Sequence, residues 1–378
     1  MLPYEVVRWR GESLAAASRC ATLVTMRASG SALAVLAAAV ALAPAAAGAP
    51  AQPEQPGREV TALSRNLYVG FDVTSVLGAT SQAEFVARAT QGWLTVEASA
   101  PALRAEAWAD EIARTRPDVV GLQEAPLFRL DMPADGPATP AEAVRYDFVG
   151  LLLGALERRG LRYSVAEEFT GADLEVPTAL GFDVRLTDRD VILVRADSQG
   201  GALRVVSSNA AAYAVNLAVP TPLGPIEITR GWVSADVRLR GRTFRIVNTH
   251  LEPFSTPIQV AQAQELLAGP LATSLPVLGL GDFNSGPGRV TPTYALLLAA
   301  GFLDAGAAGG LTCCHAVDLR NPVPAFTQRI DLVLARGGFV PLRAEVVGDE
   351  QPVRDALGLW PSDHGGPVAT LRLPEPGR

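Results

Sequence analysis

Hydrophobic residues between positions 60 and 373 follow two different spacings, and these spacings divide the chain into helices and strands. In five segments apolar residues recur three and four positions apart, which predicts helices because such residues share one helix face. The predicted helices cover residues 81–93, 101–115, 141–159, 258–268 and 291–300. They leave long stretches of chain between them that need a different structure.

Short apolar runs in those stretches predict strands. The first covers residues 60–69, and a second follows the helix of 101–115, in RPDVVGLQE. A strand-rich stretch comes next, with turns at Pro222–Pro225 and Arg240–Arg242. It is made of DVILVRA, LRVVSS, AYAVNLAV, IEITRGWVSADVRL and TFRIVNTHL, and the last strands are 277–283, RIDLVLA and GPVATLRL.

Strands outnumber helices in this pattern and alternate with them only in part. That combination favours an α+β fold over a doubly wound parallel sheet. We therefore predict a four-layer α/β/β/α sandwich, in which two packed, mostly antiparallel sheets lie between outer helices.

The first fifty residues have a different pattern. From Met26 the chain has one arginine, an apolar run over 32–42 and then small residues with an A-x-A-like site near 47–51. This pattern predicts a secretory signal over residues 1–50, with Met26 as an alternative start, and hence a secreted or extracytoplasmic protein. The run is too short to span a membrane, which takes about 20 apolar residues. Residues 51–59 are predicted to be a linker, and 60–374 a single domain.

Composition narrows the chemistry. The chain has 378 residues, of which 48% are hydrophobic and 19% charged, as expected for a large globular core. All 32 basic residues are arginines, which excludes mechanisms that need a lysine, such as Schiff-base chemistry. Residues 1–50 contribute a charge of +2 to the formal net charge of −7, so the remainder carries −9. Such an acidic chain is a poor general binder of nucleic-acid backbone.

Two cysteines, the adjacent pair Cys313 and Cys314, lie outside the predicted signal region. They could pair with each other, stay reduced or bind a ligand. The sequence leaves these alternatives open.

The motif GLGDFNS ends an apolar run with two polar residues, Asp282 and Asn284. Residues two apart in a strand share a face, so both side chains would point the same way at the end of the strand. A buried carboxylate without a partner is costly, so Asp282 calls for a metal, a histidine or solvent. A turn is the simpler alternative, because both residue types favour turns.

Other predicted strands also carry polar residues at or near their ends. Asn66, Glu124 and His250 close strands, Asp331 lies inside RIDLVLA, and Asp363 and His364 open the last strand. Each has an ordinary explanation by itself, but the chain has only three histidines and two of them belong to this set. The repeated placement predicts one shared site at the strand ends.

This ordered set resembles that of the endonuclease/exonuclease/phosphatase superfamily, which has a deoxyribonuclease-I-like fold. GDFN and SDH together carry the resemblance, which extends from about residue 60 to 373. The superfamily includes deoxyribonuclease-I-like nucleases, abasic-site endonucleases, neutral sphingomyelinases and inositol polyphosphate 5-phosphatases. The resemblance implies a phosphoester hydrolase, most simply a phosphodiesterase, that uses Mg²⁺ or Mn²⁺ to assist attack by water.

The resemblance also implies roles for the residues. Glu124 would be the leading metal ligand, assisted by Asn66 and Asp363. Asp331 would orient His364, and Asp282 would position or deprotonate the attacking water. The choice of general base between Asp282 and His364 stays open.

Three further residues would contact the phosphate. Asn284 and His250 would donate hydrogen bonds to its oxygens, and His250 is also a candidate acid. Arg230 is the best candidate for an additional cationic contact.

The spacing of 58 residues between Asn66 and Glu124 exceeds what the resemblance leads us to expect, so residues 70–100 are predicted to be an insertion near the metal. This segment contains Phe71, Phe85 and Trp93 but few arginines, which favours a small or lipid-like phosphodiester over duplex DNA. A secreted nonspecific nuclease and a noncatalytic binding protein of the same fold are the alternatives. We expect a monomer without a stable protein partner.

Overall fold

The computed structural model describes residues 58–196, 203–288, 291–350 and 357–375. The chain divides into two units, Met1–Pro53 and Glu54–Arg378, and every described residue belongs to the second. The predicted signal region and nearly all of the predicted linker therefore lie outside the described residues. No helix in the described part of the chain is long and apolar enough to cross a membrane.

The larger of the two central sheets has eight strands. Its order is β15-β16-β1-β2-β6-β3-β4, and β5 also pairs with β6. β1 and β2 are parallel, whereas the other pairs are antiparallel. The strands are β1 (Glu59–Asn66), β2 (Val119–Gln123), β3 (Leu127–Asp131), β4 (Ala143–Asp147), β5 (Tyr163–Pro177), β6 (Asp183–Arg195), β15 (Val340–Val347) and β16 (Gly366–Arg372).

The second sheet has six strands in the order β13-β14-β12-β11-β10-β7, and a separate hairpin pairs β8 with β9. Within it only β11 and β12 are parallel. The strands are β7 (Arg204–Ala212), β8 (Leu217–Thr221), β9 (Gly224–Ile228), β10 (Gly231–Leu239), β11 (Arg242–His250), β12 (Val277–Asp282), β13 (Leu303–Asp304) and β14 (Asp331–Arg336).

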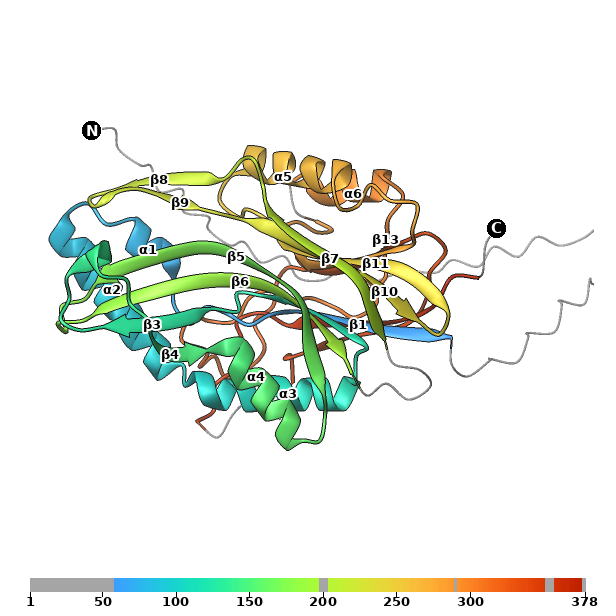
Figure 1. The fold of residues 1–378 in the computed structure, drawn as a ribbon, viewed down its shortest axis with the longest axis horizontal. Helices are drawn as coiled ribbons and strands as arrows, with labels where there is room; N and C mark the ends of the chain where they lie inside the picture. Colours follow the sequence, from blue (N-terminus) through green and yellow to red (C-terminus); the bar gives the residue numbers. More distant parts are fainter. Residues whose placement is uncertain (1–57, 197–202, 289–290, 351–356, 376–378) are drawn as a thin grey trace, which may run out of the picture. The chain divides into compact units, whose positions relative to one another are not determined.

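Helices cover the outer face of each sheet, as Figure 1 shows. α3 and α4 pack on the eight-stranded sheet through a core that includes Trp108 and Leu152, and α5 and α6 pack on the six-stranded sheet through Leu266 and Leu297. A third core fills the space between the sheets. The helices are α1 (Val73–Leu77), α2 (Gln82–Ala98), α3 (Pro101–Thr115), α4 (Phe148–Arg158), α5 (Thr256–Ala268) and α6 (Thr293–Ala299), with one 3₁₀ turn, η1 (Gly136–Ala138). The predicted four-layer sandwich is confirmed.

One buried side chain joins the two sheets. Asn248 of β11 accepts a hydrogen bond from Gln123 Nε2 (2.5 Å) and donates to the carbonyls of Leu122 (2.8 Å) and Val191 (3.2 Å) in the other sheet. Gly121 makes room for it, since a Cβ there would lie 2.5 Å from Asn248 Oδ1. A fully bonded polar group of this kind holds the sheets at one mutual position.

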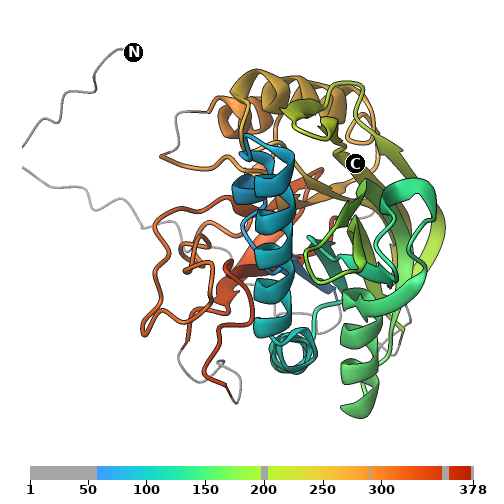
Figure 2. The ribbon, with the colours of Figure 1, turned by 90° about the vertical axis from the view of Figure 1, so that its left-hand side faces the viewer.

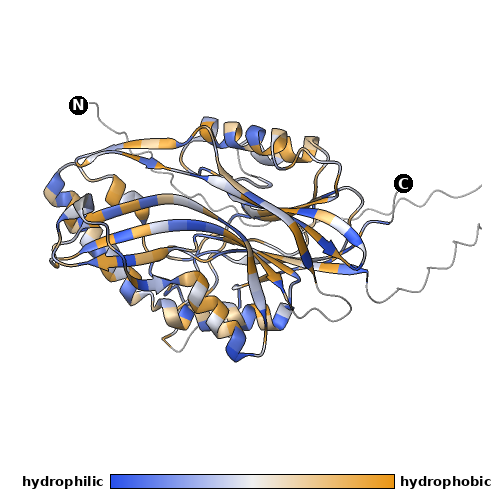
Figure 3. Ribbon diagram, viewed as in Figure 1, coloured by the Kyte–Doolittle hydropathy of each residue, from blue (hydrophilic) through white to orange (hydrophobic). Residues whose placement is uncertain are grey.

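Several details differ from the predictions. Residues 143–147 form β4 rather than the start of a helix, because Val144 and Tyr146 alternate with polar neighbours and the segment pairs with β3. In AYAVNLAV the first residue, Ala212, ends β7, and the next strand, β8, begins only at Leu217. The sequence analysis also did not predict α1, β3, β5, β13 and β15. Figure 3 shows hydrophilic and hydrophobic residues interspersed along β5 and β6.

The predicted insertion forms α1 and α2 at one end of the sandwich, which faces the viewer in Figure 2. Ser81 caps α2 by accepting from the Glu84 amide. A small core of its own, including Val76 and Phe85, packs against Ile226 of the β8–β9 hairpin. This end of the molecule therefore brings an apolar layer next to the strand ends described below.

Candidate active site

Strand pairing brings the ends of five strands together. Asn66 is the last residue of β1, and Glu124 follows β2, its parallel neighbour. In the other sheet His250, Asp282 and Asp331 stand side by side on β11, β12 and β14. Because the two sheets pack face to face, these ends form the floor of one cleft.

The cleft has a volume of about 360 Å³. The predicted residues that line it are Glu124, Arg230, His250, Asp282, Asn284, Asp363 and His364. Asn66 and Asp331 lie behind this lining and bond to it. The structure thus brings all the predicted site residues together, while their roles stay predictions.

Carboxylates crowd one side of the cleft. Asn66 Nδ2 donates to Glu124 Oε1 (3.1 Å) and lies 3.3 Å from Asp282 Oδ2, so one amide bridges two acids. Glu124 Oε2 accepts from the Val69 amide (2.7 Å), and Asn66 Oδ1 from the Tyr68 amide (2.8 Å). Asn66 in this arrangement holds the two carboxylates in place.

Burial raises the pKa values of Asp282 and Asp363 above their ordinary range. Repulsion from Asp331 and Glu124 adds to the rise for Asp282, and repulsion from Glu124 and Asp331 adds to it for Asp363, while His364 opposes it in both cases. The cleft therefore concentrates negative charge that favours a bound cation. Hard oxygen donors are the ligands that Mg²⁺ and Mn²⁺ prefer, so the residues present fit such an ion.

His364 is held as an imidazolium. Its Nδ1 donates to Asp331 Oδ2 (2.9 Å), and its amide donates to Ser362 Oγ (3.1 Å). Although burial lowers the pKa of His364, Asp331 and Asp363 outweigh that effect and hold the pKa well above its ordinary value. Nε2 is left to point at the cleft, with a proton to donate.

His250 has the opposite character. A guanidinium has only donors, so the 2.8 Å contact between Arg230 Nη1 and His250 Nδ1 makes Nδ1 an acceptor and puts the ring proton on Nε2. Burial, and then Arg230 and His364, hold the pKa of His250 well below its ordinary value. His250 is therefore a neutral donor whose Nε2 lies 3.5 Å from Asp282 Oδ2.

Asn284 occupies a constrained turn after β12. Its φ is 48°, its amide donates to Asp282 Oδ1 (2.9 Å), and its Nδ2 donates to the Leu251 carbonyl (2.9 Å). A left-handed backbone is more accessible to asparagine than to most residues. The turn fixes Asp282 and Asn284 relative to each other.

The sequence analysis did not single out Asp188 and Tyr68, which also line the cleft. Asp188 lies 3.6 Å from Arg230, and burial raises its pKa to about 6. Tyr68 donates to the Val317 carbonyl (2.8 Å). A signal for Asp188 was present, because acids beside the apolar run of residues 191–194 are unusual in a buried strand.

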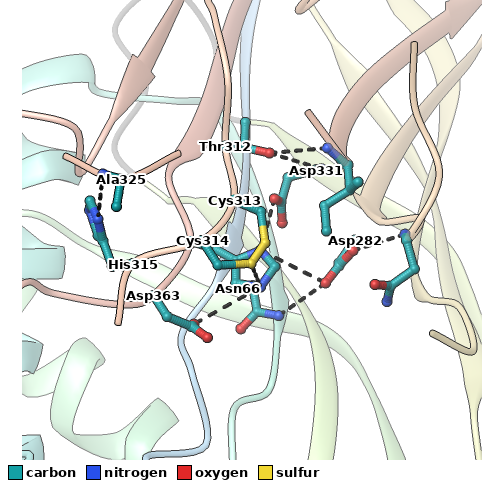
Figure 4. The surroundings of a disulfide bond; sticks show 12 residues. Asn66, Asp282, Thr312, Cys313, Cys314, His315, Ala325, Asp331 and Asp363 are labelled. Atoms are coloured by element: carbon teal, nitrogen blue, oxygen red, sulfur yellow. Dashed lines mark hydrogen bonds and ion pairs between the residues drawn. A yellow bond between two sulfur atoms is a disulfide. The ribbon is translucent and has the colours of Figure 1, made fainter. Parts of the chain in front are cut away.

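Cys313 and Cys314 form a disulfide at the edge of the cleft. Cys314 Sγ lies 4.0 Å from His364 Nε2 and lines the cleft. Figure 4 shows His315 turned toward Ala325, on the side of the cysteine pair away from Asp282.

His315 packs outside the cleft. Its ring stacks between Phe326 (4.1 Å) and Trp360 (4.3 Å), and its Nδ1 accepts from the Ala325 amide (3.3 Å). These contacts give His315 a structural place in the fold.

Two sheets pack face to face between outer helices, and carboxylates and histidines line a cleft at one edge of the sheets. This arrangement is that of a deoxyribonuclease-I-like protein. A model of the Endonuclease/Exonuclease/phosphatase family matches residues 92–364. The chain therefore belongs to the endonuclease/exonuclease/phosphatase family, whose members are hydrolases acting on phosphoester bonds. None of the curated proteins compared with the sequence is significantly similar to it.

Solved structures support the fold. A family protein from Leptotrichia buccalis is 14% identical, with a TM-score of 0.53, over 82% of this chain and 99% of that one. An endonuclease/exonuclease/phosphatase from Bacteroides vulgatus is 16% identical, with a TM-score of 0.52, over 83% and 99%. D. rerio TDP2 complexed with single strand DNA product is 17% identical, with a TM-score of 0.50, over 83% and 98%.

Proposed function

We propose that this protein hydrolyses phosphodiesters by metal-assisted attack of water. The observation that carries the proposal is the single cleft in which carboxylates face two histidines of opposite character. A phosphodiester needs a site for its negative charge, a base for water and an acid for the leaving oxygen. The cleft has a candidate for each.

Glu124 and Asp363 would hold Mg²⁺ or Mn²⁺, with Asn66 as a further candidate ligand. When bound, the ion supplies positive charge that neutralises the phosphate and its transition state. The mutual repulsion of the cleft carboxylates supports this assignment.

The other residues would move protons and bind phosphate. Asp282 takes a proton from water as the water oxygen attacks phosphorus, since its raised pKa suits a base near neutral pH. His364 gives its Nε2 proton to the departing oxygen as the P–O bond breaks. We therefore propose Asp282, rather than His364, as the general base.

His250 and Asn284 would hydrogen-bond the nonbridging oxygens. The Nε2 proton of His250 points at the cleft because Arg230 occupies Nδ1. Asn284 Nδ2 has two hydrogens, of which one bonds to Leu251. Arg230 adds positive charge near the phosphate.

A nuclease is the second candidate. A solved structure of D. rerio TDP2, which has a similar fold, contains a single strand DNA product, and this supports a nuclease as the second candidate. In the described part of the chain, however, Arg230 is the one basic residue that lines the cleft besides the histidines. The acidic lining residues are Asp72, Glu124, Asp188, Asp282 and Asp363. That balance disfavours a long polyanion.

A substrate panel tests the function. The purified protein with Mg²⁺ should hydrolyse bis(p-nitrophenyl) phosphate faster than p-nitrophenyl phosphate, and Asp282→Asn should abolish both reactions. Plasmid nicking that falls steeply between roughly 50 and 200 mM salt, without turnover of small diesters, would instead identify a nuclease. No hydrolysis of any phosphoester by the folded protein would favour the noncatalytic alternative.

We further propose that the protein is exported and that the signal is cleaved between residues 45 and 52. The charged start, the apolar run of 32–42 and the small residues after it support this proposal. N-terminal sequencing of protein from the culture medium should find a terminus in that range. An intact start at Met1 or Met26 on a cytosolic protein would contradict it.

A further inference from the structure

An apolar cavity of about 70 Å³ lies beside the catalytic cleft. Every side chain that lines it is apolar. α2 contributes Phe85, Ala89 and Trp93, and the opposite wall includes Val176 of β5 and Ile226 of β9. A cavity with such a lining is a poor site for water and a good one for a hydrocarbon group.

The cavity and the cleft share a wall. Phe71, Val73, Leu77, Leu174 and Leu186 line both, and each of them is half-buried. A substituent that extends from the phosphate across this wall would therefore contact apolar side chains.

Phe71 is fixed in that wall by a glycine. A Cβ at Gly92 would lie 2.9 Å from Phe71 Cδ2, so the ring rests directly on the backbone of α2. This contact keeps the ring between the cleft and the cavity.

The cleft itself adds two observations. Phe254 lines it with 57% of its surface exposed, so it offers a further apolar contact beside the phosphate site. Acidic residues dominate its polar lining, and Arg230 is the one arginine among the described residues that line it. A single phosphate joined to an apolar chain suits this lining better than a polymer of phosphates.

We propose that the cavity is a subsite for the apolar part of the substrate, a phosphoester that carries an alkyl or acyl chain. The proposal rests on the phosphodiesterase function proposed above and names the class of substrate for it. The alkyl or acyl chain of the substrate would extend from the phosphate past Phe71 and Leu77 and end against α2.

Alkyl p-nitrophenyl phosphates with chains from methyl to octyl test the proposal, because the reacting bond stays the same. They are assayed with Mg²⁺ below the concentration at which they form micelles. We expect kcat/KM to rise roughly fourfold for each methylene group that is buried, until the cavity is full. A flat series with measurable turnover would overturn the subsite and leave the phosphodiesterase function standing. No turnover of any member would contradict the function itself.

Two substitutions locate the effect. Ala89→Leu fills the cavity, and Leu77→Gln makes the shared wall polar at a half-buried position. Each should bring the octyl-to-methyl ratio of kcat/KM close to one. Leu94→Gln is the matched control, since Leu94 lies on α2 with 45% of its surface exposed and should keep the wild-type ratio.

The proposal also fails if the wild-type ratio persists in Ala89→Leu and Leu77→Gln. The chain would then bind elsewhere, and the cavity would be a packing void. Thermal unfolding of each variant checks that a changed ratio comes from folded protein.

Discussion

His364→Ala should lower kcat by about 10²- to 10⁴-fold, the range typical of a positioned acid or base. The reason is the ion pair with Asp331, which keeps the ring protonated and leaves Nε2–H facing the cleft. Steady-state kinetics with diphenyl phosphate, whose phenolate is a poor leaving group, measures the loss. Bis(p-nitrophenyl) phosphate should recover part of the activity, because p-nitrophenolate needs less help from an acid.

His250→Ala should cost a similar factor for a different reason. Its neutral ring donates from Nε2, so the variant loses a hydrogen bond to the phosphate, and a better leaving group should not restore activity. His315→Ala is the matched control. It should lower the melting temperature, because the ring stacks on Phe326 and Trp360, while kcat of the folded fraction stays within a few-fold. Equal losses of kcat for all three histidines would show that the roles are misassigned.

Removal of divalent metal should abolish activity, and Mg²⁺ or Mn²⁺ should restore it. Glu124→Gln should weaken Mn²⁺ binding in calorimetry by at least about tenfold, the lower end of losses seen even for outer-sphere partners. The fold should survive, because a glutamine oxygen can still accept from the Val69 amide.

Glu227→Gln is the matched control for the metal experiment. Glu227 is exposed on β9, outside the cleft, so Mn²⁺ affinity and turnover should match the wild type. Full activity in chelator, or a stoichiometric structural zinc, would rule out the proposed role of the metal.

Strands buried on both faces were the easiest elements to predict. β12 is buried at every position, and its sequence VLGLGD is a continuous apolar run up to the aspartate. β5 escaped prediction because acids such as Glu167 and Glu175 interrupt it and most of its residues are only half-buried. Residues 143–147 were wrongly assigned to a helix because five residues are too few to distinguish the two periods.

The site was predictable as far as local signals reach. A polar residue at the end of an apolar run marks Asn66, Glu124 or Asp282 without any knowledge of the fold. Which ends meet depends on strand pairing, such as the register between His250 and Asp282, which no local pattern specifies. The apolar cavity was out of reach for the same reason, since its walls come from segments between residues 71 and 226.

The position of α1 and α2 has a consequence for how such an enzyme can diversify. α1 and α2 form one continuous segment of the chain between Asn66 and Glu124. They supply much of the apolar wall of the cavity but none of the predicted catalytic residues. If the proposed subsite holds the substrate, a change within residues 70–100 would alter which molecules are accepted, while the residues proposed to transfer protons stay untouched. The proposed selectivity could thus evolve or be redesigned through one short segment of the gene.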